Sequence, residues 1–299
     1  MVDLHKLSLS DTFKNVFKLT LKQSLHEDPN EVAIALGSDM LNIEQLMIEK
    51  FLGFYNEKPG DVKNYIYIAW CLWAYLVHQQ RAIRDRLIGG KVPFYSGVPS
   101  NTKVISLNYT IFLEDAVGKN NAVYFHGDLR KYVRMDTRDL TAIDDFEGKD
   151  IMTILNEEVL PNIDLTAEEV VNQKHVIPAM VPPLRLKPIL SREYIEVWHE
   201  ADEWIREATK IVIAGYSLST SDEHFNDILR AHRGGKKIDI IGPSVLNEFY
   251  QSRCEKVFGI SPNAWSKTKI QGYDTHKSDG VRLIQANADE VDLEALFSS

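Results

Sequence analysis

The first hundred residues carry a hydrophobic pattern that predicts helices. Apolar residues recur at every third or fourth position in three segments: 13–19, 43–52 and 65–84. That spacing places the apolar side chains along one face of a helix. A cluster of glycine, proline and serine at 89–100 interrupts the pattern, so we expect a mainly helical part, residues 1–100, to end there.

After residue 100 the pattern changes to short runs rich in β-branched and aromatic residues, which predict strands. Five such runs occur: 103–107, 122–125, 210–214, 237–241 and 281–284. Four of them are almost continuously apolar, as expected of parallel strands that are covered on both faces. Helical patterns flank the third run, at 194–208 and 223–232. We therefore expect an α/β fold with a Rossmann-like doubly wound parallel sheet formed by residues 101–299.

The stretch from 131 to 175 interrupts this alternation and is rich in aspartate and glutamate. We expect it to form an inserted helical lobe over the site. The alternative is a solvated excursion of the chain without a packing role.

A doubly wound sheet also needs a central first strand, followed by a glycine turn that contacts phosphate. The candidate is the apolar run 31–36, and the amides of Gly37 and Ser38 then contact the phosphate. The residues from Asp28 to Glu31 also have the composition of a helix start, with a cap, a proline in the first turn and a capping-box acid. Both interpretations of 31–36 remain open, and the helical one predicts that the chain does not bind NAD.

Charge and hydropathy narrow the classes of partner. With 34 Lys and Arg against 43 Asp and Glu, the net charge of −9 disfavours nucleic acid as the main partner. The most apolar stretch, 65–77, is shorter than the ~20 residues of a membrane span. Residues 1–10 lack the basic start and apolar run of a secretory signal. We expect a cytoplasmic protein with neither a membrane nor a nucleic-acid partner.

Two predicted strands end in residues suited to chemistry. The run 103–107 leads into Asn108, and the run 122–125 leads into His126 and Gly127. Because the carboxyl ends of parallel strands line the ligand crevice, Asn108 and His126 are expected at the same rim. An amide there positions a water or a ribose hydroxyl, and an imidazole transfers protons near neutral pH. The alternative roles are a helix cap for Asn108 and a structural one for His126.

Two later strands end in glycine turns. The run 210–214 leads into Gly215, Tyr216, Ser217 and, before the next helix, Asp222, a combination that suits ribose or phosphate. A serine nucleophile elbow is disfavoured, because that motif needs a second glycine where this chain has Ser219. The last turn begins at Gly242 and either closes on the adenine side of a dinucleotide or is an ordinary turn.

The order of these motifs resembles that of the sirtuin-like family of NAD-binding Rossmann folds, over about residues 100–290. The resemblance rests on Asn108-Tyr109-Thr110, His126-Gly127, Gly215-Tyr216-Ser217-Leu218 with Asp222, and Gly242-Pro243. Many family members carry a four-cysteine zinc module, whereas this chain has only Cys71 and Cys254, so it resembles the zinc-free bacterial branch. Thr110 stands where the family usually has Asp, and Gly242 where it often has Asn. The first two motifs are also similar to the abortive infection protein H family.

The resemblance implies that NAD is the substrate and that its nicotinamide–ribose bond is cleaved, giving nicotinamide and ADP-ribose or a cyclic product, in anti-phage defence. It implies that Asn108 places the attacking water and that His126 acts as the base. Further contacts to NAD are expected from Gly37, Ser38, Thr110, Gly127, Gly215, Tyr216, Ser217, Asp222 and Gly242. It also implies a homo-oligomer or a defence-system partner. The alternative is an inactive module that binds NAD or ADP-ribose or assembles with a partner.

The sequence predicts that the protein holds no structural zinc. It has no Cys-x-x-Cys pair, and its nine histidines are scattered along the chain. Elemental analysis of the purified protein is expected to find far less than one zinc per chain, and a stoichiometric zinc content would contradict this prediction.

Overall fold

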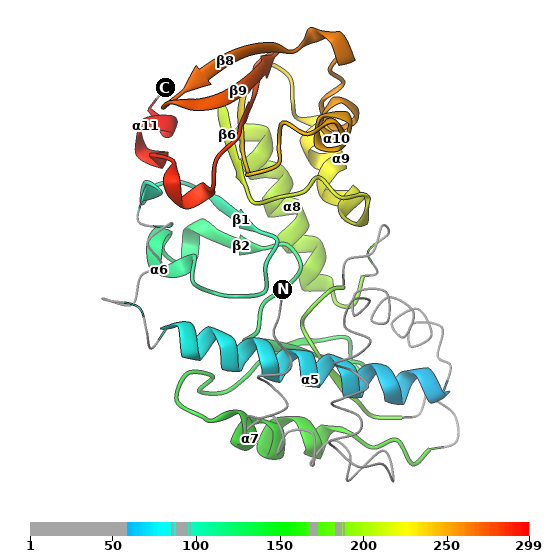
Figure 1. The fold of residues 1–299 in the computed structure, drawn as a ribbon. Helices are drawn as coiled ribbons and strands as arrows, with labels where there is room; N and C mark the ends of the chain where they lie inside the picture. The colour runs from blue at the N-terminus through cyan, green and yellow to red at the C-terminus, as the bar shows by residue number, and fades with distance from the viewer. Residues whose placement is uncertain are drawn as a thin grey trace.

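The computed structural model describes residues 59–84, 87, 95, 97–167, 173–182, 187 and 189–298 (Figure 1). The predicted strand at 31–36 and the expected phosphate contacts of Gly37 and Ser38 lie outside these residues. In Figure 1 the long helix α5 crosses one half of the molecule, and a mixed sheet stands at the opposite end.

The predicted helix at 65–84 is confirmed as part of α5, Pro59–Arg84. Two of its tryptophans are buried and donate to backbone carbonyls: Trp70 Nε1 lies 2.9 Å from Val176 O, and Trp73 Nε1 lies 2.7 Å from Leu129 O. Since these carbonyls come from chain segments far beyond the helix, α5 forms part of the core. Within the described residues, no helix has both the length and the hydropathy needed to cross a membrane.

All five strands expected from the apolar runs are present. β1, Val104–Ser106, and β2, Ala122–Tyr124, form a parallel pair. β6, Lys210–Ala214, β7, Lys237–Ile241, and β10, Val281–Ile284, are parallel to one another within a five-stranded sheet of order β6-β7-β10-β9-β8. The α/β class is therefore confirmed, with mixed parallel and antiparallel pairing.

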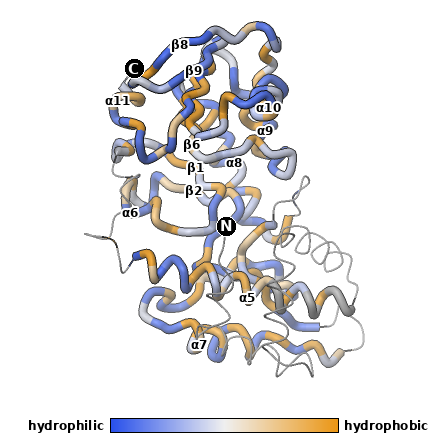
Figure 2. Tube along the Cα trace, viewed as in Figure 1, coloured by the Kyte–Doolittle hydropathy of each residue, from blue (hydrophilic) through white to orange (hydrophobic). Residues whose placement is uncertain are grey.

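The antiparallel edge of this sheet was not predicted. β8, Ser266–Ile270, and β9, Tyr273–Ser278, pair antiparallel to each other, and β9 pairs with β10. Both strands are rich in lysine, serine and threonine, and β8 is largely hydrophilic in Figure 2. An edge strand that faces water needs no apolar run, so hydrophobic patterning does not detect it.

The expectation of a helical lobe at 131–175 is wrong for much of that stretch. β3, Lys131–Arg134, pairs antiparallel with both β4, Leu140–Ala142, and β5, Val176–Pro178. Among the described residues of this stretch, helical turns are confined to the middle: α7 (Ile151–Ile154), η5 (Leu155–Val159) and η6 (Leu160–Asn162). The acidic residues there serve partly as caps, since the Asp150 carboxylate accepts from two backbone amides at the start of α7.

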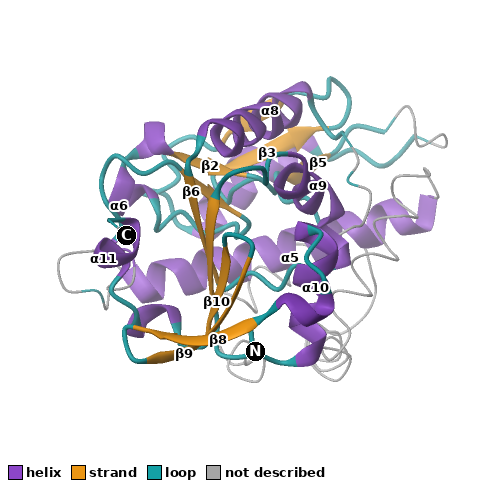
Figure 3. Ribbon diagram, turned by 90° about the horizontal axis from the view of Figure 1, so that it is seen from above, coloured by secondary structure: helices purple, strands orange, loops and turns teal. Residues whose placement is uncertain are grey.

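The remaining helices cover the strands. α8, Arg192–Glu207, and α9, Glu223–Ala231, confirm the helices predicted at 194–208 and 223–232. α8 contacts both β2 and α9, and Figure 3 shows it beside them from above. Three further helices are α6 (Glu114–Val117), α10 (Glu248–Phe258) and α11 (Leu293–Phe297). Two large apolar clusters result, one around α5 and one around β6, β7 and α10.

A buried carboxylate lies inside the five-stranded sheet. Asp239, in the middle of β7, is 0% exposed. It receives a two-pronged ion pair from Arg282 of β10, with Nη2 2.6 Å from Oδ2, and lies 3.3 Å from the Lys210 ammonium of β6. One anion therefore forms ion pairs with cations on both neighbouring strands.

We predict that Asp239→Asn lowers the free energy of unfolding by about 3–5 kcal/mol, because it leaves the two cations without their buried anion. Asp279→Asn is the matched control: Asp279 pairs with Arg233 but is mostly exposed, so its loss costs less than about 1 kcal/mol. Urea denaturation of both variants measures the difference, and equal losses would contradict this account.

Candidate functional site

β1 and β2 end at the same edge of their parallel pair. Ser106 pairs with Tyr124, and the Phe125 amide donates to Ser106 O at 2.9 Å. The residues that follow are therefore neighbours: His126 Nδ1 lies 3.1 Å from the carbonyl oxygen of Leu107, the residue just before Asn108. The structure thus places the two candidate catalytic positions, Asn108 and His126, at one edge, with Asn108 exposed and His126 only 4% exposed.

His126 also meets the loop after β6. Its Nε2 lies 3.1 Å from Asp222 Oδ1, and both side chains are largely buried. Asp222 precedes α9 at its N-cap, yet its side chain makes no capping bond. The carboxylate faces His126 instead, so the loop following β6 is joined to the end of β2.

A lysine completes this cluster. The Lys187 ammonium, 0% exposed on its side chain, lies 3.0 Å from Asp222 Oδ1 and donates to Ser221 O at 3.3 Å. We name His126, Asp222 and Lys187 the edge triad. Lys187 was not predicted from the sequence, although the stretch 176–190 is apolar apart from Arg185 and Lys187, and a lysine in such a stretch signals a buried, paired cation.

Burial and pairing act in opposite directions on this cluster. Burial alone raises the pKa of Asp222, but the close polar contact and charge of His126, together with the Lys187 ammonium, outweigh it and hold that pKa below its usual value. Burial lowers the pKa of Lys187, and the carboxylate of Asp222 offsets only part of that effect. Asp222 is therefore an anion held between two basic groups.

The two neighbours of the His126 ring are both hydrogen-bond acceptors. A carbonyl oxygen lies 3.1 Å from Nδ1 and a carboxylate oxygen lies 3.1 Å from Nε2, although Nε2 and that carboxylate oxygen do not meet the geometry of a hydrogen bond. A neutral ring carries one N–H and can donate to only one acceptor. For His126 to accept a proton from a substrate, one of these contacts has to open.

The turn after β6 contains an exposed glycine and a buried leucine, both with a positive φ. Gly215 has φ +68° and is exposed, and a Cβ there would meet no atom within 4 Å. Leu218 has φ +49° although it is a leucine, and its side chain is 1% exposed. Burial of Leu218 offsets the roughly 1–2 kcal/mol that a left-handed conformation costs a residue with a Cβ.

Three residues that were not predicted hold this turn in place. The Tyr216 hydroxyl donates to Asn226 Oδ1 at 2.8 Å, and the Tyr250 hydroxyl donates to Tyr216 O at 2.7 Å. Arg253 Nη1 donates to Ser217 O at 3.0 Å. Burial raises the pKa of the Tyr216 hydroxyl, with the Asp222 charge adding to the effect. The Tyr216 side chain thus fixes the turn, while Ser217 is exposed.

Two of the expected contact glycines are accounted for by packing within the chain. Gly127 has φ +87°, and a Cβ there would lie 1.9 Å from Ala179 O. Gly242 donates its N–H to Ile284 O at 3.2 Å, and a Cβ there would lie 2.9 Å from the Val245 side chain. At Gly127 the group that approaches the backbone closely is the carbonyl of Ala179, which belongs to the chain itself.

Asn108 and Thr110 lie in the loop between β1 and α6. Asn108 N–H donates to Ser106 Oγ at 3.1 Å, and Thr110 is half-buried. The cap of α6 is Leu113, so the alternative role of Asn108 as a helix cap is excluded.

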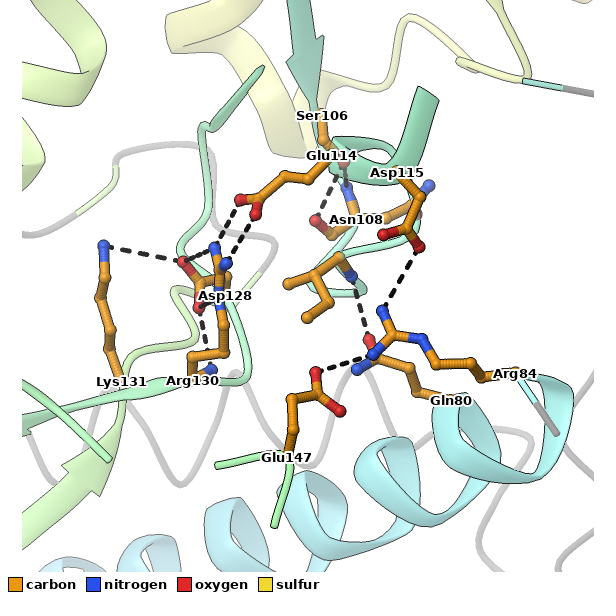
Figure 4. Close-up of polar contacts among 11 residues, drawn as sticks. Gln80, Arg84, Ser106, Asn108, Glu114, Asp115, Asp128, Arg130, Lys131 and Glu147 are labelled. Atoms are coloured by element: carbon orange, nitrogen blue, oxygen red, sulfur yellow. Dashed lines mark hydrogen bonds and ion pairs between the residues drawn. The ribbon is translucent and has the colours of Figure 1, made fainter. Parts of the chain in front are cut away.

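A network of polar contacts with α5 and with the segment after β2 fixes this loop (Figure 4). Gln80 Oε1 accepts from the Ile111 amide at 2.9 Å, and Arg84 pairs with Asp115. Arg130 makes a two-pronged ion pair with Glu114, at 2.7 and 2.8 Å. Helix α5, outside the predicted Rossmann part, therefore helps to position Asn108.

Comparisons with models of protein families, with curated proteins and with solved structures found no match to this chain. Within the described part of the chain, no group of three or more His, Cys, Asp or Glu side chains is arranged to hold a metal ion.

A cavity of about 440 Å³ lies at the other edge of the parallel strands. It is lined by residues at the start of β7 and β10 and in the β9–β10 turn, including Lys237, Asp279 and Arg282. β6 and β7 end at Gly215 and Gly242, whereas this cavity lies near the start of β7. The cavity is therefore at the opposite end of the strands from the edge triad.

We predict that Asp222→Asn lowers the free energy of unfolding by about 3–5 kcal/mol, since it leaves the buried Lys187 ammonium without its anion. The double variant Asp222→Asn/Lys187→Met is expected to lose clearly less than the sum of the two single losses, because no unpaired charge remains. Chemical denaturation of the four proteins of this cycle measures the coupling. Additive losses would show that the two side chains do not interact.

Proposed function

We propose that this protein is an NAD hydrolase and that the edge formed by the ends of β1, β2 and β6 is its active site. The observation that carries the proposal is the contact of His126 with both Leu107 O and Asp222 Oδ1, which brings three strand ends together. Ligands of open α/β sheets bind at this edge. The resemblance to sirtuin-like NAD hydrolases supports the same assignment.

In the proposed reaction, the Asn108 amide holds a water near C1′ of the nicotinamide ribose. The C1′–N bond breaks through an oxocarbenium-like state, nicotinamide leaves with the bonding electrons, and the water oxygen bonds to C1′. His126 takes the proton of that water. A small rotation away from Leu107 O frees Nδ1 for this role, while Nε2–H stays on Asp222 and keeps the ring in the required tautomer.

The proposal has three further parts. β1 and β2 form a two-stranded sheet apart from the five-stranded one; in this proposal the two sheets are parts of one Rossmann-like doubly wound fold, supported by the parallel pairing within each. Tyr216, Ser217, Thr110 and Asp222 lie along the nucleotide, supported by their positions at the same edge. The protein works in the cytoplasm in anti-phage defence, as a homo-oligomer or with a partner, for which the support is the resemblance alone.

A second candidate function is an inactive module that binds NAD or ADP-ribose. The observation that favours it is the burial of His126, with acceptors at both ring nitrogens. In that case the edge triad has a structural role only.

We predict that the purified protein, alone or with lysate of infected cells, releases nicotinamide from NAD. Asn108→Ala and His126→Ala are each expected to reduce the rate by about 100-fold or more, the range typical of a lost positioning or acid–base group. The matched control is His199→Ala, because His199 lies on α8 and is exposed, and this variant should keep the wild-type rate. Liquid chromatography quantifies nicotinamide, and thermal melts check folding.

One outcome would contradict the active-site assignment, and another would contradict the hydrolase. Unchanged turnover in both Asn108→Ala and His126→Ala would show that neither residue takes part in the reaction. ADP-ribose binding without any turnover, with every preparation, would favour the binding module.

A further inference from the structure

An exposed phenylalanine lies in the first turn of α10. Phe249 is 67% exposed, more than any other large hydrophobic side chain in the described part of the chain. The Arg253 guanidinium carbon lies 4.1 Å from the centre of its ring, so one face of the ring is covered by a cation. The large exposed fraction leaves the other face open. An aromatic ring held in this way in water gains little stability from its position.

This pair lies beside the turn that follows β6. Arg253 donates to Ser217 O, and Tyr250, the residue next to Phe249, donates its hydroxyl to Tyr216 O. The same turn contains Gly215, where the space beside the backbone is open. Phe249 and Arg253 therefore lie beside the turn at the end of β6, which is part of the proposed active-site edge.

Arg253 has no ion pair with a carboxylate within the described part of the chain. Among the described residues its guanidinium contacts an aromatic ring and a carbonyl oxygen, and no carboxylate pairs with it. A guanidinium has five N–H donors in one plane, and the bond to Ser217 O uses Nη1, so donors remain for an anion.

We propose that Phe249 and Arg253 form the subsite for the adenosine–phosphate half of the substrate. The adenine base stacks on the open face of the Phe249 ring, and the pyrophosphate accepts hydrogen bonds from Arg253 near the Gly215 turn. Stacking on an aromatic ring and a guanidinium fork are the standard means of holding a base and a phosphate. This assignment rests on the proposed function for the direction of the nucleotide, with its nicotinamide end at Asn108.

The test is calorimetric titration of the full-length chain with ADP-ribose and, separately, with nicotinamide mononucleotide, which lacks adenine. Phe249→Ala is expected to weaken ADP-ribose binding about tenfold and to leave the mononucleotide within twofold. Phe249→Tyr keeps the ring and should keep the affinity. Arg253→Gln is expected to weaken ADP-ribose binding more than binding of adenosine, which has no phosphate.

Exposed residues on α8 provide the matched controls. Ile195→Ala removes an apolar side chain that is 49% exposed, and Arg192→Gln removes an arginine in an exposed ion pair. Both should bind ADP-ribose as the wild type does, which separates a subsite from a general effect of surface mutation.

Turnover of NAD, measured in parallel, distinguishes the two proposals. Wild-type affinity for ADP-ribose in both Phe249→Ala and Arg253→Gln would overturn the subsite even if NAD is still hydrolysed. Absence of ADP-ribose binding by the wild type would overturn it as well. A tenfold loss in Phe249→Ala would support the subsite even in a chain that hydrolyses no NAD, where only the hydrolase assignment would fail.

Discussion

The candidate site depends on the contacts of the Asp222 carboxylate. It faces the His126 imidazole and the Lys187 ammonium, and so joins the end of β2, the segment before α8 and the loop after β6. These segments also belong to different apolar clusters, with Ala179 and Val181 in the one around α5, and Leu218 and Phe225 in the one around β6. A buried anion between two bases therefore fixes both the geometry of the edge and the contact between the two cores.

Elements with a clear apolar pattern were predictable from the sequence, and those without one were not. The runs at 210–214 and 237–241 are mainly apolar and match β6, which is largely half-buried, and β7, which is largely buried. β8 escapes prediction because it has no apolar run, and β3 because only its two middle residues are buried, which is too short a run to give a pattern. In the site, Asn108 and His126 could be predicted at one edge because both follow the ends of parallel strands. Lys187 pairs with the carboxylate of Asp222, which only the fold brings near. Sequence patterns do not contain that information.

The site combines an exposed and a buried member. Asn108 faces water, while His126 is covered and has an acceptor at each nitrogen. In the proposed hydrolase this is the state before substrate arrives, and the entering ribose replaces the contact with Leu107 O. The Gly215 turn is held by hydrogen bonds from Tyr250 and Arg253, and in the proposed hydrolase the rest of the nucleotide lies along it. In the proposed hydrolase, the turn stays in place when substrate binds, and only the His126 side chain has to move.

The position of a bound nucleotide tests this account most directly. A crystal structure of the protein with ADP-ribose is expected to show the ribose beside Asn108 and His126 and the pyrophosphate along the turn at Gly215. Electron density for the ligand in the cavity at the opposite edge, against Lys237 and Arg282, with the edge triad unchanged, would contradict the account.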